Sequence, residues 1–423
     1  MAGLKSIVNI WKNIGEVDLQ PLRDEALRLV KVAIVGAAGV GRHTLAEAMR
    51  HDPQRPDASS QTPILITDVE TPTGVAYADL IILMVDATRA NFQAEQAAER
   101  RWRDMGKKVL VFCNKVDALE EGQVLRQWIG REGERMLYGS AADRKFLERI
   151  FVPVVLEMLP EMHLALGRQF PLFRLAIARQ LINETCFSNA AYALSTGLAE
   201  AIPSLDLPLN VADMIVLTKS QAFLVYKLGL IVGFSTQWQD YVAEFGGVIG
   251  GGFLWRQLAR QLVGLIPVYG IVPKVAVAYA GTFVVGNAVL QWYLTGKHVT
   301  RQQVSELYRQ AFARGKTAAR QLLERVRPRR QGKDAATALP QPGKDIPELA
   351  GGRATLQGLP APEAGALAIS VDGETPPAEK AKAPAARKAL FGRGQRRQKT
   401  CPRCHKASAA DAQFCQYCGD PLP

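Results

Sequence analysis

A glycine-rich turn that follows a short apolar run constrains this chain more than any other feature. From position 31 the sequence is KVAIVGAAGVGRHTLAEAM, where the apolar run ends at Gly36 and a helical pattern begins near Arg42. Gly36 and Gly41 have the spacing of the phosphate-binding motif G-x-x-x-x-G-K-S/T, and Gly39 lies between them. A strand, a turn and a helix in this order predict one unit of a parallel α/β sheet.

The residues that carry charge and metal in that motif are replaced here. Arg42 takes the place of the lysine, although a planar guanidinium differs from a compact ammonium group. His43 takes the place of the Mg²⁺-binding hydroxyl, and Thr44, one position later, is the remaining candidate ligand because Mg²⁺ prefers oxygen. The backbone N–H groups of the turn and the N-terminus of the following helix can still bind phosphate.

A second informative segment is KKVLVFCNKVDAL, in which a buried strand is predicted to end at N-K-V-D, residues 114–117. A third segment, GSAAD, holds Ser140 and Ala141 before the next helical pattern. A glycine loop, N-K-x-D and S-A in this order resemble the G domain of Ras-like and Era-like GTPases over residues 31–160. The alternative is that N-K-V-D is only a helix-capping turn.

The resemblance implies a role for each of these residues in binding GDP or GTP. Asp117 would accept hydrogen bonds from the ring N–H and the amino group of guanine, two adjacent donors that a carboxylate can accept together. Lys115 would pack along the base, and Asn114 would brace the loops. Ser140 and Ala141 would lie near the base carbonyl.

The segments that support hydrolysis in Ras-like proteins are shortened. Only HDPQRPDASSQTP separates the first helix from the next strand, too little for both an effector loop and a second strand. In ITDVETPTG, Asp68 and Gly74 have the wrong spacing for D-x-x-G, and no second switch helix fits. Since phosphoryl transfer needs a positioned water and a metal, we expect a degenerate G domain that binds nucleotide weakly or only keeps the fold. A slow active GTPase that uses Arg42 and Thr44 is the first alternative.

Hydrophobic periodicity predicts the elements around these motifs. Strand and helix patterns alternate from residue 31 to about 160, which predicts a parallel sheet. The predicted strands are residues 31–35, 64–67, 80–85 and 109–112. The predicted helices are residues 43–50, 91–104, 119–136 and 143–158.

Residues 165–326 are predicted to be all-helical and are rich in Gly, Ala and Val. Within them, LIPVYGIVPKVAVAYAGTFVVGNAVLQWYL resembles the YcjF-related bacterial helical family, and EVDLQPLRDEALRLVKVAIVG resembles that family's entry into its G domain. The biochemical role of that family is poorly defined. The resemblance therefore implies a multidomain architecture, a helical domain behind a GTPase-like domain, rather than an activity.

Residues 275–294 are an uncharged run with the length of a membrane span, about 20 residues. Ala278, Thr282 and Gly286 recur at every fourth position, which suits close helix packing. Either this run inserts as a hairpin with residues 211–235, or the helices form a bundle with the run in its core. We favour association with the cytoplasmic face of a bacterial membrane, since the nearby basic helix attracts anionic lipid.

Three further segments complete this part of the chain. Residues 1–30 are predicted to begin with an amphipathic leader helix. Residues 301–326 place apolar side chains on one stripe and Arg and Lys on the other, which predicts a basic surface helix. Residues 327–399 lose all periodicity and fill with Pro, Ala, Gly, Lys and Arg, as in a disordered linker. The net charge of +12 favours an acidic partner, such as anionic lipid, nucleic acid or an acidic protein.

The end of the chain, CPRCHKASAADAQFCQYCG, has the spacing C-x₂-C-x₁₀-C-x₂-C. Its thiols match tetrahedral Zn²⁺ and resemble the short zinc ribbons at the ends of many bacterial proteins: Cys401, Cys404, Cys415 and Cys418. Four thiolates leave no open position, so the zinc is expected to be structural. His405 is expected to be exposed and surplus. The module, residues 400–423, is expected to fold only with metal and to contact a protein partner.

Together these features predict a membrane-associated, GTPase-like adaptor in the bacterial cytosol. Cys113 and Cys186 stand alone in apolar surroundings and are expected to be buried free thiols, which suits a reducing compartment. The second alternative is a soluble nucleic-acid-binding or scaffold protein that uses the basic tail and the zinc ribbon, although no aromatic pattern in the tail supports base recognition. The sequence carries no signal of oligomeric state.

Overall fold

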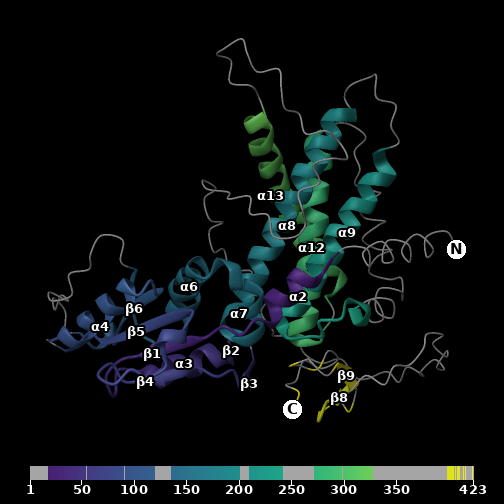
Figure 1. Cartoon of the computed structure of the whole chain (residues 1–423). Coiled ribbons are helices and arrows are strands. Elements are labelled where there is room, and N and C mark those ends of the chain that lie inside the picture. The colour runs from purple at the N-terminus through teal and green to yellow at the C-terminus, as the bar shows by residue number, and fades with distance from the viewer. Residues whose placement is uncertain are drawn as a thin grey trace. The chain divides into compact units, whose positions relative to one another are not determined.

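The structure is a computed structural model. It describes residues 18–53, 55–89, 91–119, 135–200, 209–241, 271–297 and 299–326, and parts of the C-terminal module (398–403, 405, 407–409, 413, 415 and 422). The sheet before residue 160 and the helices after it belong to one compact unit, as Figure 1 shows by their labels. Of the predicted leader segment, residues 1–30, residues 1–17 lie outside the described residues, and the rest contains the helix α2 (Gln20–Leu27). Residues 327–397 of the predicted linker also lie outside the described residues.

A parallel sheet organises the first part of the chain. Its strands are β1 (Val32–Val35), β4 (Leu65–Thr67), β5 (Leu80–Asp86), β6 (Val109–Asn114) and β7 (Met136–Tyr138). They lie in the order β4-β1-β5-β6-β7, and every neighbouring pair is parallel. The predicted parallel α/β sheet is therefore confirmed, and the four predicted strands agree with β1, β4, β5 and β6 to within two residues.

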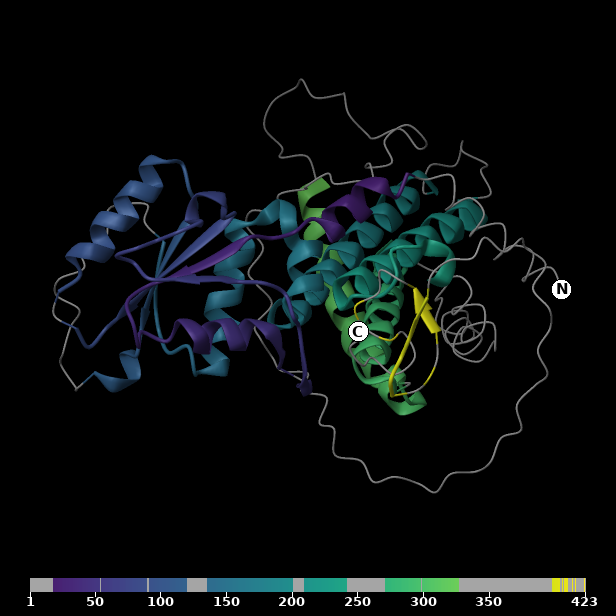
Figure 2. The ribbon, with the colours of Figure 1, turned by 60° about the horizontal axis from the view of Figure 1, so that its bottom comes forward.

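Strands β5 and β6 form the centre of the core, because nearly all their residues are buried. Their unbroken Val, Ile and Leu runs are typical of strands covered on both faces. Helices α3 (Arg42–Arg50) and α4 (Gln93–Asp104) lie on opposite faces of the sheet (Figure 2). The helical stretch α5 (Arg144–Phe146), η3 (Leu147–Phe151) and α6 (Val152–Met158) packs on Phe112 of β6 through Phe146 and Phe151.

Two elements correct the sequence-based assignment. The helix predicted over 119–136 is wrong at its end, where Met136–Tyr138 form β7, and its residues 120–134 lie outside the described residues. A run of three residues is too short to show a strand period. The segment after α3 forms a small antiparallel pair, β2 (His51–Asp52) and β3 (Arg55–Ser59). This hairpin is separate from the main sheet, which gains no strand from the described residues there.

The second part is helical, as predicted. Its helices are α7 (His163–Gln169), α8 (Pro171–Glu200), α9 (Leu209–Val232), α12 (Ile271–Thr295) and α13 (Arg301–Val326), and α2 (Gln20–Leu27) packs on α7. A Cβ on Gly286 would come within 2.7 Å of Ile182, and one on Gly315 within 2.9 Å of the Ala276 carbonyl. Gly286 therefore permits close helix contact, as its spacing from Ala278 and Thr282 predicted, and Gly315 does the same without having been predicted.

Helix α12 lies at the centre of the bundle, against α8, α9 and α13. It is long and apolar enough to cross a membrane, and most of it is buried inside the protein. An apolar helix of this kind fits a bundle core as well as a bilayer. Helix α13 covers it with a stripe of buried side chains that includes Val304, Leu307 and Ala311, which confirms the predicted amphipathic surface helix.

A buried ion pair joins the hairpin after α3 to α8. The carboxylate of Asp52 lies 3.7 Å from the guanidinium of Arg174, and the two side chains are only 7% and 4% exposed. Arg174 also donates through Nε to the Gly167 carbonyl at 3.1 Å, at the end of α7. One guanidinium therefore fixes the hairpin, α7 and α8 to each other.

Gln169 adds three hydrogen bonds at the same junction. Its side chain accepts from Val30 N–H at 3.1 Å, immediately before β1, and donates to the Arg28 carbonyl at 2.6 Å. Its backbone carbonyl accepts from the Thr62 hydroxyl at 2.8 Å. Beside it, Arg168 donates to the Phe234 carbonyl at 2.7 Å, just past α9. The sheet and the helices thus share buried polar contacts, which we call the Gln169 junction (Asp52, Arg174, Gln169 and Arg168).

Candidate nucleotide-binding site

The glycine loop lies at the topological switch point of the sheet, where strands are added on opposite sides of β1. From β1 the chain crosses through α3 to β4 on one side, whereas β5 pairs with β1 on the other side. Ligands of open α/β sheets bind in the crevice outside the carboxyl ends of the strands at such a point. The loop after β1 and the residues that follow β5, β6 and β7 share this edge, because these strands are parallel.

Each predicted glycine of the loop has a conformational reason. Gly39 and Gly41 have φ values of +75° and +103°, which L side chains rarely adopt. A Cβ on Gly36 would lie 2.5 Å from the Met84 carbonyl of β5, and a Cβ on Gly41 would collide with the Asn114 amide. The loop therefore packs too tightly against β5 and β6 to accept larger residues in place of Gly36 and Gly41.

Asn114 holds two of the loops together. Its amide donates to the Val40 carbonyl at 2.7 Å, and its carbonyl accepts from Ala141 N–H at 2.7 Å. The side chain is buried, with 5% of the residue exposed. The residue that the resemblance assigns to bracing the loops thus links the glycine loop to the S-A segment, while Ser140 beside it is half-buried.

Replacing Asn114 by alanine is expected to lower the free energy of unfolding by about 2–4 kcal/mol, because Val40 C=O and Ala141 N–H would be buried without partners. Chemical denaturation of the full chain measures the change. Asn91→Ala is the matched control, since Asn91 is exposed and accepts one local hydrogen bond from Gln93 N–H. Equal effects of the two changes would show that Asn114 does not brace the site.

Lys115 forms an ion pair with the residue that ends β5. It has a left-handed φ of +64°, and its ammonium group lies 2.7 Å from the Asp86 carboxylate at the end of β5. Burial acts to raise the pKa of Asp86, but hydrogen bonds from Lys115 and Thr88 outweigh it and hold the pKa below its usual value. Asp117 lies on the short turn η2 (Val116–Ala118) and is exposed, and no ion pair joins it to another described residue.

Arg42, the replacement for the lysine, folds onto the end of β4. It donates through Nη1 to the Thr67 carbonyl at 2.5 Å, and the same nitrogen lies 3.6 Å from the Asp68 carboxylate. Its side chain is 14% exposed. His43 and Thr44, in the first turn of α3, are both exposed. The loop cation therefore has an acidic neighbour of its own.

The sequence motifs did not reveal that two carboxylates of this edge, Asp68 and Asp86, pair with Arg42 and Lys115. Both follow or end a parallel strand, β4 and β5, and this position was the available signal. The spacing of Asp68 from Gly74 directed attention to a D-x-x-G motif instead. The turn η1 (Val75–Tyr77) is the only helical element in the described residues between β4 and β5, so a second switch helix is absent there, as predicted.

The C-terminal module is described in part. Strands β8 (Gln398–Thr400) and β9 (Ala407–Ala409) form an antiparallel pair around the first two cysteine positions. Cys401 is buried, and its carbonyl accepts from His405 N–H at 2.9 Å. His405 is exposed, as predicted, and has a φ of +56°. Cys415 is buried, whereas Cys404 and Cys418 lie outside the described residues.

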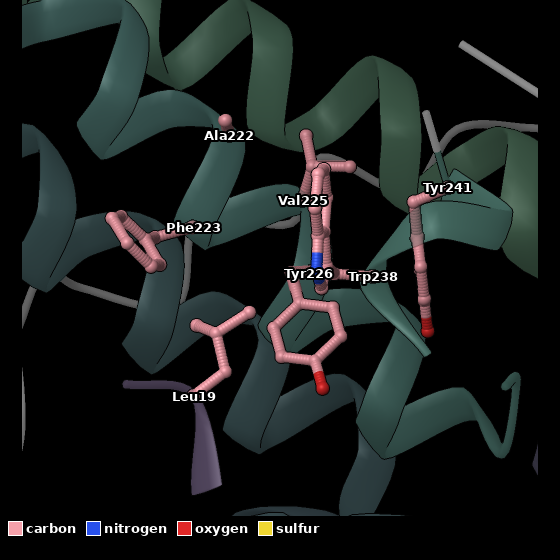
Figure 3. Close-up of a pocket in the computed structure, with 7 residues that line it drawn as sticks. All are labelled: Leu19, Ala222, Phe223, Val225, Tyr226, Trp238 and Tyr241. Atoms are coloured by element: carbon pink, nitrogen blue, oxygen red, sulfur yellow. The ribbon is translucent and has the colours of Figure 1, made fainter. Parts of the chain in front are cut away.

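A small apolar pocket lies between the start of α2 and α9 (Figure 3). It is lined by Leu19, Ala222, Phe223, Val225, Tyr226, Trp238 and Tyr241. The hydroxyls of Tyr226 and Tyr241 donate to the Thr236 and Ser235 carbonyls, at 2.6 and 2.8 Å. Since its lining carries no charged group, the pocket is a packing gap between helices rather than a site for an ionic ligand.

Comparison with known proteins adds no identity. A scan against protein-family models finds no match, and a search of curated proteins finds no relative. The function proposed below therefore rests on the residues and contacts of this chain.

Proposed function

We propose that the chain is a membrane-associated adaptor built on a degenerate G domain that binds GDP or GTP weakly and has at most residual hydrolytic activity. The single observation that carries the proposal is the pair of hydrogen bonds of Asn114, which link the glycine loop to the S-A segment at the topological switch point of the sheet. A helix-capping turn would not need this buried link between loops from β1, β6 and β7. The carboxylate of Asp117 is exposed at the same edge of the sheet, where it would accept hydrogen bonds from guanine.

Weak hydrolysis follows from the residues around the loop. Phosphoryl transfer is catalysed by a metal that bridges the phosphates and by a residue that orients the attacking water. Arg42 is engaged with Thr67 and Asp68, and the adjacent α3 residue is a histidine. A slow GTPase that uses Arg42 and Thr44 is the rival, and it predicts multiple turnovers that disappear when Arg42 is changed.

The adaptor role combines the other parts of the chain. We assign the helical part to the YcjF-related architecture and the four C-terminal cysteines to a structural zinc ribbon that contacts a protein partner. Basic side chains of α13 are exposed along the bundle and would attract the anionic lipids of the cytoplasmic leaflet: Arg309, Arg314, Lys316 and Arg320. Sedimentation with membranes tests this part; release by salt indicates surface attachment, and recovery in the soluble fraction at low salt contradicts both modes of attachment.

Asp117→Asn is expected to exchange guanine for xanthine specificity. The carboxylate accepts from the amino group of guanine, whereas an amide can donate to the carbonyl that xanthine carries at that position. Calorimetry on the full chain should show a loss of GDP affinity of about tenfold or more, equal to about 1.4 kcal/mol, and a gain for XDP. Asp104→Asn, an exposed change at the end of α4, is the matched control.

Two results would contradict the proposed function. Equal affinity for ADP and GDP would show that Asp117 does not select the base. Unchanged GDP binding by Asp117→Asn would place the nucleotide elsewhere or leave only a retained fold.

A further inference from the structure

The donor set at the glycine loop does not fit the Mg²⁺ ion that G domains hold with their nucleotide. The ion prefers oxygen ligands in octahedral geometry, and the residue in the place of the hydroxyl is the exposed imidazole of His43. The carboxylate of Asp68, beside the loop, faces the guanidinium of Arg42. No group of three or more His, Cys, Asp or Glu side chains that could hold a metal occurs among the described residues.

We propose that this site binds the diphosphate of a guanine nucleotide without Mg²⁺, with the guanidinium of Arg42 as its fixed cation and Asp68 as a competitor that the phosphate displaces. The inference rests on the proposed function and adds to it the metal requirement and the switch between two partners of Arg42.

The geometry of Arg42 suits this exchange. A guanidinium has five N–H donors in a rigid fork, and both contacts found in the described structure run through Nη1. The bond to the Thr67 carbonyl holds the side chain beside the loop. The distance of 3.6 Å to Asp68 is longer than a charge-assisted hydrogen bond, about 2.7–2.9 Å. The carboxylate is thus a loose partner that a phosphate can replace.

The charge balance of this edge points the same way. Arg42 and Lys115 each have a carboxylate beside them, Asp68 and Asp86 respectively. The Lys115 pair is short, at 2.7 Å, and two bonds from Thr88 also hold Asp86 in place, whereas Asp68 accepts one other hydrogen bond, from Glu70 N–H at 3.0 Å. Of the two pairs, the Arg42–Asp68 pair is the one that opens more easily, and it lies at the N-terminus of α3, where the helix dipole favours an anion.

The first test compares GDP affinity of the full chain in excess Mg²⁺ and in excess EDTA. We expect the same dissociation constant in both, whereas a loss of about tenfold or more in EDTA, about 1.4 kcal/mol, would overturn the inference. Because EDTA also removes zinc, Cys401→Ser is measured in both buffers to show the effect of an unfolded C-terminal module alone. Absence of GDP binding in both buffers would overturn the proposed function as well.

The second test is Asp68→Asn, which removes the competing charge and keeps the shape. We expect GDP to bind about tenfold more tightly, a magnitude discounted for the partial exposure of Asp68. A carboxylate that helped to hold Mg²⁺ would give the opposite sign, weaker binding in Mg²⁺, and that result would overturn the inference. Glu70→Gln, two residues away and exposed, is the matched control and should leave the affinity unchanged.

Discussion

Arg174→Met is expected to lower the free energy of unfolding by about 3–5 kcal/mol, the usual cost of breaking a buried ion pair from one side. The side chain of Asp52, which is 7% exposed, would lose the guanidinium 3.7 Å away. The Gly167 carbonyl would also lose its bond to Arg174 Nε. The loss is large because burial prevents water from replacing either contact.

Thermal or chemical unfolding of the full chain measures this change. Arg144→Met is the matched control, because the Arg144–Glu148 pair is exposed on α5 and such pairs contribute about 0–1 kcal/mol. The double change Asp52→Leu with Arg174→Met should recover most of the loss, since no buried charge remains. An effect of Arg174→Met as small as that of Arg144→Met would show that the ion pair does not hold the hairpin to α8.

Removal of zinc is expected to unfold the C-terminal module completely. Four thiolates at about 2.3 Å from one ion supply most of the folding free energy of so small a unit. Cys401 is buried, and its carbonyl accepts a hydrogen bond from His405 N–H. Purified full-length protein should contain one zinc per chain, and Cys401→Ser should contain none.

Metal analysis and thiol titration after purification without chelator measure this result. Cys113→Ala is the matched control, because Cys113 is a buried free cysteine of β6 and burial raises its pKa to about 12. It should keep the full zinc content. Zinc content near zero in the unchanged protein, or four freely titrating C-terminal thiols, would refute the zinc ribbon.

The sheet could be predicted because its signals are local. The apolar runs of β5 and β6 are long enough to mark buried strands, and Gly36 marks the end of β1. Asn114 could be predicted at the carboxyl edge of the sheet because it ends the apolar run of β6. The predicted free thiols Cys113 and Cys186 are buried, as their apolar neighbours indicated.

The features that could not be predicted depend on contacts between residues that are distant along the chain. The residues around Arg42 do not indicate that Asp68 will lie beside it. The two residues are brought together by the pairing of β4 with β1, which are separated in the sequence by α3 and the hairpin. Lys115 likewise contacts Asp86, 29 positions earlier, through the pairing of β5 with β6. Strand β7 was missed because three residues carry no periodic signal.

The Gln169 junction bears on how such a chain can be inherited. A cut between residues 160 and 169 would take the partner of Val30 N–H and of the Thr62 hydroxyl away from the sheet. The same cut would leave Asp52 without Arg174. Recombination that replaces this sheet by another one therefore breaks these contacts unless the new sheet supplies equivalent partners. A lineage that replaces the buried Asp52 is therefore expected to replace Arg174, at the start of α8, as well.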